Sequence, residues 1–188
     1  MPQPTARTFL IRRLIVLGLL IAIIWGVVAG VGALFGAIGS WFAPATTITA
    51  GAPCAPGTVG VTAIVGDASG EKLSFEGSER PQVWFRITNN GTVACKFNAG
   101  PRVQFFKITS GDELIWNSKD CPRAGLGDLE VTLKPGESKE SGKNEWYRVH
   151  SSSSGCGDGQ VPAEAGAYKL YAEVNGVLSD NLEQFLLN

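Results

Sequence analysis

The fold is decided by residues 81–116, which read PQVWFRITNNGTVACKFNAGPRVQFFKITSGDELIW. Apolar and polar residues alternate within residues 82–88, a period that is typical of a β-strand with one buried face. Residues 89–91 are Asn-Asn-Gly, which tolerate positive φ and favour a tight turn between two strands. Residues 110–112 are Ser-Gly-Asp and predict a second hairpin. The stretch therefore predicts a series of short antiparallel strands.

The same alternation continues on both sides of this stretch. Lys134-Pro135-Gly136 ends one strand, because proline cannot donate to a ladder, and Asn175-Gly176 predicts the closing hairpin. About eight or nine short strands without a convincing helix are typical of an all-β sandwich whose sheets bury one face against each other. The further strands are expected in residues 58–65, 71–77, 129–133, 145–150, 167–174 and 182–188.

Residues 14–42 carry no charge and predict one N-terminal transmembrane helix, because a bilayer core needs about 20 apolar residues. A cleaved signal peptide is the alternative, but its apolar region usually spans only about 7–15 residues. Arg7, Arg12 and Arg13 favour a cytoplasmic N-terminus. We therefore expect a single-pass cell-membrane protein with an extracytoplasmic C-terminal domain.

Charge and composition predict four parts of the chain. The predicted parts are a cytoplasmic N-terminus (1–13), the helix (14–42), a linker rich in Pro, Thr, Ala and Gly (43–57), and the sandwich (58–188). The whole chain has 16 basic and 17 acidic residues, and three of the basic residues precede residue 14. The remainder therefore has 13 basic and 17 acidic residues, a net charge of −4, and no basic stripe. Nucleic acid is not an expected partner.

Small residues recur at four-residue spacing in the predicted helix. Such spacing lets a second helix approach closely, so the bilayer and a membrane-protein or homo-oligomeric partner are the expected contacts of this segment. The alternative is that glycine is simply common in membrane helices. The glycines concerned are Gly26, Gly30, Gly32 and Gly36.

Cys54, Cys95, Cys121 and Cys156 all lie on the C-terminal side of the apolar segment. An even number of cysteines there predicts a disulfide framework in an oxidising compartment. Four unpaired buried thiols are the alternative. The C-x-x-C spacing of a zinc site or a thioredoxin-like motif is not found.

Three stretches carry a family resemblance: residues 81–116, VTLKPGES (131–138) and AGAYKLYAEV (165–174). They resemble the Ig-like β-sandwich family typified by bacterial intracellular proteinase inhibitors of the BsuPI type. With the added cysteines, the chain is similar to uncharacterised membrane-anchored actinobacterial proteins. The resemblance covers roughly residues 54–174 and implies an Ig-like antiparallel sandwich, an extracellular location and disulfides, but no activity.

Four cysteines allow three disulfide pairings. Beside this resemblance we expect the pairs Cys54–Cys95 and Cys121–Cys156. Each pair would close a loop of about 35–40 residues and stabilise the fold by about 3–4 kcal/mol in the chain-entropy model. The second pair would fix the serine-rich loop.

That loop, HSSSSGCGDG (150–159), holds the only histidine of the chain, His150, beside four serines. A serine hydrolase also needs a nucleophile on a rigid turn and an acid that orients the base, and the pattern provides neither. One histidine and scattered acids do not form a metal-ligand set. No glycine-rich phosphate loop opens a helix, so no cofactor is expected. We therefore expect a protein that is not an enzyme and a flexible loop pinned at Cys156.

Three functions remain. The first is a membrane-anchored accessory or interaction module, in which Trp84, Trp146 or His150 would contact a partner if exposed. The second is a surface-tethered protease inhibitor that uses residues 150–160. The third is an envelope glycan-binding module that uses Trp84 or Trp146. Trp116, at a strand end, is expected in the core.

Overall fold

The computed structural model of the chain describes residues 17–19 and 51–188. Residues 17–19 are helical and belong to a different compact unit from residues 51–188, which we describe by themselves. Among the described residues, no helix has both the length and the apolar composition needed to cross a membrane. Most of the predicted transmembrane helix 14–42 lies outside the described residues, and so do its glycines Gly26, Gly30, Gly32 and Gly36.

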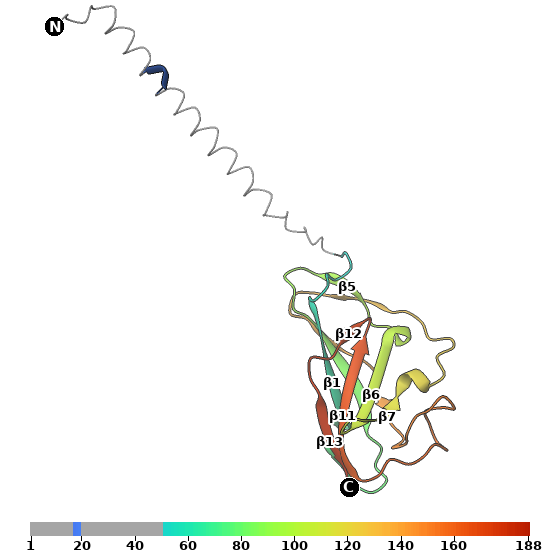
Figure 1. Cartoon of the computed structure of the whole chain (residues 1–188). Coiled ribbons are helices and arrows are strands. Elements are labelled where there is room, and N and C mark those ends of the chain that lie inside the picture. The colour runs from blue at the N-terminus through green and yellow to red at the C-terminus, as the bar shows by residue number, and fades with distance from the viewer. Residues whose placement is uncertain (1–16, 20–50) are drawn as a thin grey trace, which may run out of the picture. The chain divides into compact units, whose positions relative to one another are not determined.

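Two β-sheets form the body of the domain (Figure 1). The first sheet has the order β10-β4-β1-β2, and β9 also pairs with β4. Its strands are β1 (Val59–Asp67), β2 (Gly70–Glu71), β4 (Gln82–Asn89), β9 (Ser138–Glu140) and β10 (Asn144–Glu145).

The second sheet has the order β3-β13-β11-β6-β7, with β12 beside β11. All its pairs are antiparallel except β3 with β13. Its strands are β3 (Ser74–Phe75), β6 (Gln104–Ser110), β7 (Glu113–Asn117), β11 (Gly166–Val174), β12 (Val177–Leu178) and β13 (Glu183–Leu187).

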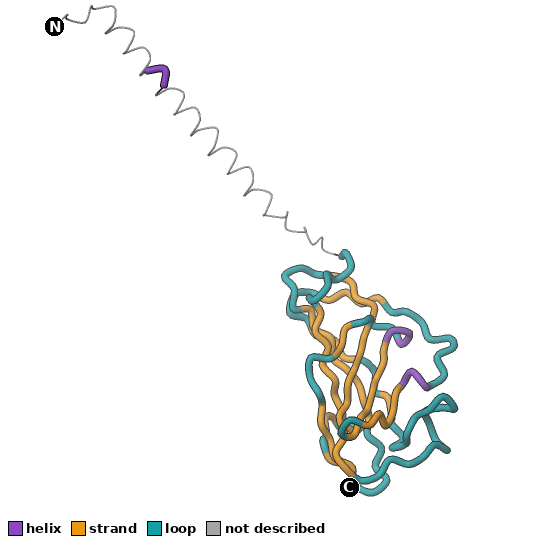
Figure 2. Tube along the Cα trace, in the orientation of Figure 1, coloured by secondary structure: helices purple, strands orange, loops and turns teal. Residues whose placement is uncertain are grey.

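A separate ribbon pairs β5 (Cys95–Asn98) with β8 (Glu130–Leu133). It lies at the opposite end of the domain from the C-terminus (Figure 1). There are two short 3-10 helices: η1 (Pro101–Val103) lies between β5 and β6, and η2 (Ser118–Asp120) lies between β7 and β8. They are the purple segments beside the long loops in Figure 2.

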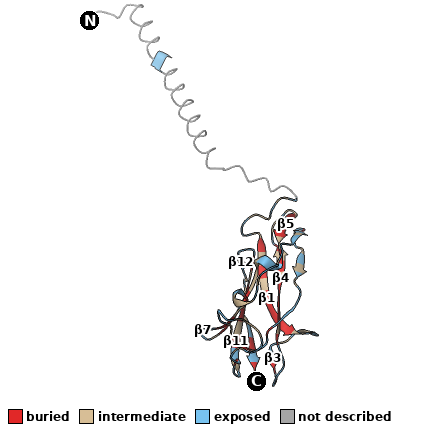
Figure 3. Cartoon of the chain, turned by 90° about the vertical axis from the view of Figure 1, so that its right-hand side faces the viewer, coloured by how far each residue is buried: buried red, intermediate tan, exposed pale blue. Residues whose placement is uncertain are grey.

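The core lies between the two sheets, and the buried strand segments are red in Figure 3. The longer strands contribute alternate residues, such as Val61 and Val65 from β1 and Leu170 and Ala172 from β11. Trp146 is completely buried and contacts Phe185 edge-on, with ring centroids 5.9 Å apart. Apolar burial of this kind stabilises the domain by about 25 cal/mol per Å² removed from water.

The prediction of an all-β sandwich is therefore confirmed, but the number of strands differs. The structure has thirteen strands in residues 51–188 instead of eight or nine. The differences lie in short segments: β9 and β12 have no expected counterpart, the expected strand 71–77 is divided between β2 and β3, and the expected strand 145–150 is a strand only at Glu145, in β10. Such segments are too short to show an alternating pattern, so the sequence does not reveal them.

Two of the predicted hairpins are confirmed. Ser110 pairs with Glu113 across the turn of β6 and β7, and Gly111 has φ +58°. Asn175 and Gly176 have φ +50° and +79°, the signs that a type I′ hairpin requires. This second turn joins β11 to β12.

The predicted hairpin at residues 89–91 is wrong. Strands β4 and β5 belong to different sheets, and β5 pairs with β8 instead. The chain leaves β4 at Asn89, where hydrogen bonds of the buried Asn89 side chain take the place of the backbone pairing that a hairpin between β4 and β5 would form. Its Nδ2 donates to the carbonyls of Val93 (2.9 Å) and Leu133 (3.0 Å), and its Oδ1 accepts from Gly91 N.

Both disulfides form as predicted, Cys54–Cys95 and Cys121–Cys156. The first joins the N-terminal end of the domain to β5. Backbone bonds support it: Cys54 N donates to Lys96 O (2.9 Å), and Lys96 N donates to Ala52 O (2.8 Å). The C-terminal part of the predicted linker 43–57 is therefore part of the folded domain.

Candidate functional site

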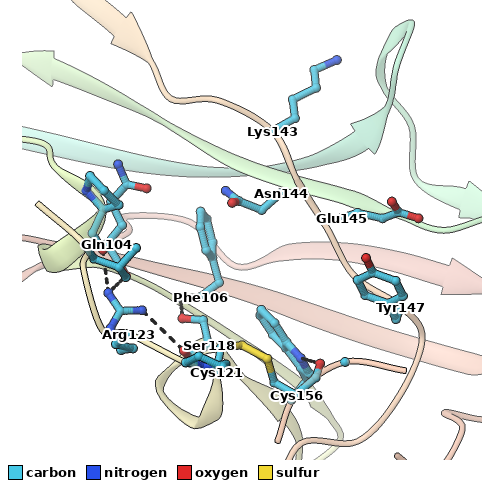
Figure 4. A pocket seen from close by; sticks show the side chains of 15 residues that line it. Gln104, Phe106, Ser118, Cys121, Arg123, Lys143, Asn144, Glu145, Tyr147 and Cys156 are labelled. Carbon is cyan, nitrogen blue, oxygen red and sulfur yellow. Dashed lines mark hydrogen bonds between the residues drawn. A yellow bond between two sulfur atoms is a disulfide. The ribbon is translucent and has the colours of Figure 1, made fainter. Parts of the chain in front are cut away.

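A cavity of about 460 Å³ opens where the edges of the two sheets meet (Figure 4). We call it the edge cavity. Strand β10 of the first sheet lines one side, and residues of β6, β7 and the segment after η2 line the other. Its main lining residues are Phe106, Trp116, Arg123, Asn144, Tyr147 and the Cys121–Cys156 disulfide.

The apolar side of the edge cavity is fixed by hydrogen bonds to the backbone. Trp116 is 5% exposed, which confirms its predicted place in the core. Its Nε1 donates to the carbonyl of Cys156 at 2.8 Å. The backbone N of Phe106 donates to Ser118 Oγ at 2.9 Å. The first bond ties Cys156 to β7 and the second ties η2 to β6, so the wall is fixed by hydrogen bonds as well as by the disulfide.

Arg123 stabilises the segment after η2. Its Nη2 donates to the carbonyls of Pro101 (2.6 Å), Arg102 (3.1 Å) and Gln104 (3.1 Å). The guanidinium lies 4.4 Å from the ring centroid of Phe105, a cation–π contact. Because these interactions occupy the guanidinium, Arg123 shapes the edge cavity more than it offers a free charge to it.

The open rim of the edge cavity carries the accessible polar groups. Asn144 and Glu145 are exposed, and Tyr147 is 37% exposed. Arg80 lies 4.5 Å from the ring centroid of Tyr147 and pairs with Glu145 at 3.2 Å. The Lys143 side chain points away (Figure 4), and its Nζ donates to the Asp67 carbonyl at 2.7 Å. A partner would therefore meet an amide, a carboxylate and an aromatic ring.

The serine-rich loop is more ordered than its composition predicts. Ser151 Oγ donates to Asp120 and accepts from Asn117 N at 2.8 Å. Ser152 and Gly155 exchange two backbone hydrogen bonds of 2.9 and 3.0 Å. Together with Cys156, these contacts hold the loop at several points instead of one.

His150 does not join a catalytic arrangement within the described part of the chain. It is half-buried, and its backbone N donates to Val161 O at 2.7 Å. The neighbouring Ser151 hydroxyl is directed to Asp120 and not to the imidazole. In residues 51–188, no group of three or more His, Cys, Asp or Glu residues is placed to hold a metal ion.

Trp84 and Trp146 are both buried, 3% and 0% exposed. Trp84 Nε1 donates to Glu140 Oε2 at 3.2 Å, and Lys143 Nζ lies 4.6 Å from its ring centroid. Trp146 Nε1 donates to Val149 O at 3.0 Å. The glycan-binding hypothesis required an exposed indole, and neither tryptophan provides one.

The structure thus brings together only part of the predicted site residues. Cys121 and Cys156 line the edge cavity, whereas Trp84 and Trp146 are buried in the protein interior. Asn144 and Tyr147 were not predicted as site residues. The sequence gives only an indirect signal for them. Tyr147 follows Trp146 in the stretch that leads to Cys156, and the second disulfide joins Cys156 to the segment after η2.

Comparison with known proteins adds little. No family model matches the chain, and no curated protein matches it. Similar solved structures include a β-glucosidase from Erythrobacter marinus, with TM-score 0.40 and 18% identity over 69% of this chain and 15% of that one. An alkylpurine DNA glycosylase from Pseudomonas fluorescens, bound to DNA containing an abasic site analog, has TM-score 0.38 and 14% identity over 70% and 30% of the two chains.

A CARDB domain from Pyrococcus furiosus has TM-score 0.32 and 14% identity over 69% of this chain and 94% of its own. This chain spans less than a third of the length of the two enzymes. At these TM-scores, the likenesses carry no conclusion about the function of the chain.

Proposed function

We propose that the chain is a membrane-anchored extracytoplasmic interaction module with an Ig-like sandwich and no catalytic activity. It binds another component of a membrane or envelope complex. The edge cavity carries this proposal, because it joins a rigid wall to an accessible polar and aromatic rim.

The dimensions and composition of the edge cavity support a binding role. Its volume of about 460 Å³ falls within the range of about 300–1,000 Å³ that is typical of ligand sites. Tyrosine is enriched among residues that dominate binding energy, and Tyr147 is the exposed aromatic residue of the rim. A wall fixed by a disulfide lowers the entropic cost of binding.

The location of the module is supported by the sequence and by the cysteines. The uncharged stretch 14–42 follows three arginines, a pattern that favours an extracytoplasmic C-terminal domain. The described cysteines are all paired, and disulfides persist mainly in oxidising compartments.

Co-purification tests the interaction. The full chain would be cross-linked in its native membranes, extracted in mild detergent, and its partners quantified by mass spectrometry. Tyr147→Ala is expected to lower recovery of the main partner at least about tenfold, the effect of removing a hot-spot side chain worth about 1.4 kcal/mol or more. Leu73→Ala is the matched control, since Leu73 is 51% exposed outside the edge cavity.

Two results would count against the proposal. One is recovery of the chain alone, without any partner. The other is equal recovery of a partner with the wild type, Tyr147→Ala and Leu73→Ala. Thermal unfolding of each variant separates a lost contact from a lost fold.

Protease inhibition is a second candidate, which the order of the loop at residues 150–160 favours. Inhibitory loops must be rigid, and this loop is held by Cys156 and by Ser151. The test is titration of subtilisin-like and trypsin-like proteases with the full chain in detergent. Inhibition at equimolar amounts that is lost in the Cys121→Ser/Cys156→Ser variant would support this candidate. Full activity of every protease would exclude inhibition of those two classes.

A further inference from the structure

The second sheet turns a cationic and aromatic surface away from the core. We call it the cationic face. Alternation along the strands puts Tyr168, Leu170 and Ala172 of β11 inside, and the residues between them outside. The cationic face comprises three lysines, one acid and four apolar or aromatic residues: Lys107, Lys119, Lys169, Glu173, Phe105, Tyr171, Leu178 and Leu182.

A hollow of about 410 Å³ lies on this face between β6, β11 and the segment after β12. Lys107 and Tyr171 are direct partners across β6 and β11, and so are Phe105 and Glu173. Leu178 and Leu182 close one side of the hollow. The hollow therefore has charged, aromatic and aliphatic walls.

The cations lie against the aromatic rings. Lys107 Nζ is 4.2 Å from the ring centroid of Tyr171, and Lys119 Nζ is 4.5 Å from that of Phe105. A cation–π contact at an exposed site contributes about 0.5–1 kcal/mol. The ammonium groups are consequently held at the surface of the sheet, where an anionic group can reach them.

The positive charge of this face is only partly neutralised locally. Lys119 pairs with Glu173 at 3.3 Å, but among the described residues neither Lys107 nor Lys169 forms a salt bridge. The acids of the neighbouring segment are directed elsewhere. Asp180 lies beside Gly60 of β1, and Glu183 accepts from Asn181 Nδ2 at 3.0 Å.

This local excess of positive charge belongs to a domain that is acidic as a whole, with a net charge of −4 in residues 44–188. A positive patch on a negative domain gives a directional signal for a partner of opposite charge. Apolar exposure accompanies it, since Leu178 is 67% and Leu182 50% exposed. The complementary partner is therefore both anionic and partly apolar.

We propose that the cationic face docks an acidic segment of another protein. Its carboxylates lie near Lys107 and Lys169, and one of its apolar side chains fills the hollow beside Leu178. A second copy of the chain that docks through the same face is disfavoured, because the two faces would oppose like charges. A lipid surface is disfavoured too, because a flat layer of headgroups leaves the hollow unfilled. The inference goes beyond the proposed function, since this face is separate from the opening of the edge cavity.

Site-specific photo-crosslinking tests the inference on the full chain in its native membranes. A benzophenone amino acid replaces Leu178 in one variant and Tyr147 in a second. Crosslinked peptides are identified by mass spectrometry. Position 178 is expected to crosslink to a segment of another protein with a net negative charge.

Charge reversal provides the matched comparison. Lys107→Glu, combined with the probe at 178, is expected to lower the crosslinked yield at least about tenfold. Lys134→Glu is the control, because Lys134 is also exposed and forms no salt bridge among the described residues, and it lies in the turn after β8. It should leave the yield unchanged. Thermal unfolding confirms that both variants fold.

Several outcomes overturn the inference: crosslinks at 178 only to lipid, only to a second copy, to a segment without net negative charge, or none. A yield that Lys107→Glu and Lys134→Glu lower equally overturns it as well. Position 147 separates this failure from that of the proposed function. Crosslinks at 147 without crosslinks at 178 remove the acidic partner alone, and silence at both positions removes both.

Discussion

The buried amide of Asn89 sets the path of the chain after β4. Asn89 is completely buried, and its three side-chain hydrogen bonds connect residues 91–93 with the end of β8. Its backbone N donates to Glu137 O at 3.0 Å. One side chain thus joins the first sheet to the β5–β8 ribbon.

Asn89→Ala should therefore destabilise the domain by about 2–4 kcal/mol, because it leaves the buried Leu133 carbonyl, the partly buried Val93 carbonyl and the Gly91 N–H without their partner. Chemical denaturation of the full chain in detergent measures the change. Asn90→Ala is the control, since Asn90 is exposed and the change should stay within about 0.5 kcal/mol. Equal effects of the two substitutions would contradict the role assigned to Asn89.

Glu183 gives the stability of the domain a dependence on pH. Burial raises the pKa of the Glu183 carboxyl above its ordinary value, although the hydrogen bond from Asn181 acts in the opposite direction. The folded state therefore binds this proton more tightly than the unfolded chain. Stability is lost as the pH rises from the unfolded pKa, about 4.3, through the folded pKa.

Glu183→Gln should therefore stabilise the domain at pH 7, by less than about 1 kcal/mol because solvent screens a partly exposed group. The difference should disappear below about pH 4, where the carboxyl is protonated in both states. Thermal unfolding from pH 3 to pH 8 measures it, with Glu164→Gln at an exposed position as control. A difference that does not change with pH would contradict the assignment.

The sequence could show that Trp84 lies opposite Val83 and Phe85, but not that it is buried. The groups that cover it come from distant positions: Glu140 and Lys143 from the β9–β10 segment, and Gly66 from β1. A Cβ at Gly66 would lie 2.8 Å from the Trp84 ring. The alternating pattern shows on which face of the sheet a residue lies, but only the tertiary structure shows whether other residues bury that face.

At the scale of elements, the Cys121–Cys156 disulfide organises one wall of the edge cavity. It joins the segment after η2 to the serine-rich loop, and the loop is further held by Ser151 and by the bond from Trp116. The other contacts of the loop are individual hydrogen bonds, partly buried or exposed. The covalent link is therefore expected to dominate its order.

Cys121→Ser/Cys156→Ser should lower the free energy of unfolding by about 3–4 kcal/mol, because the lost link closes a loop with a sequence separation of 35. Hydrogen exchange should increase most in residues 150–160, while β1, β4 and β11 keep their protection. Chemical denaturation measures the free energy of unfolding, and mass spectrometry measures the exchange of each segment. Uniformly faster exchange through the two sheets would show that the link supports the core instead.

Elements with a local signal were predictable from the sequence, and elements formed by distant pairing were not. The Ser-Gly-Asp and Asn-Gly turns lie where the residues place them, because positive φ is a local requirement. The pairing of β5 with β8 has a different cause. It depends on the Asn89 side chain and on a partner strand more than 30 residues away. The edge cavity was missed for the same reason.

At the scale of the whole molecule, the charge is unevenly distributed. The domain is acidic as a whole, yet Lys107 of β6, Lys169 of β11 and Lys119 of η2 gather on the cationic face. The edge cavity and the cationic face lie on the two sides of residues 117–123, since both are lined by Phe106 and by parts of this segment. A partner that reaches both surfaces would be held by a rigid part of the domain.

The most direct test of the account is cross-linking of intact cells with a membrane-impermeant, amine-reactive reagent. Lys143 is exposed and belongs to the segment that lines the edge cavity, but its side chain points away from the opening, so the spacer arm of the reagent has to reach a partner bound there; Lys134 lies in the turn after β8. We predict that Lys143 becomes linked to a lysine of another envelope protein in unbroken cells, with a higher yield than Lys134. Labelling of the domain only after the cells are broken, or links from Lys143 only within the chain, would contradict it.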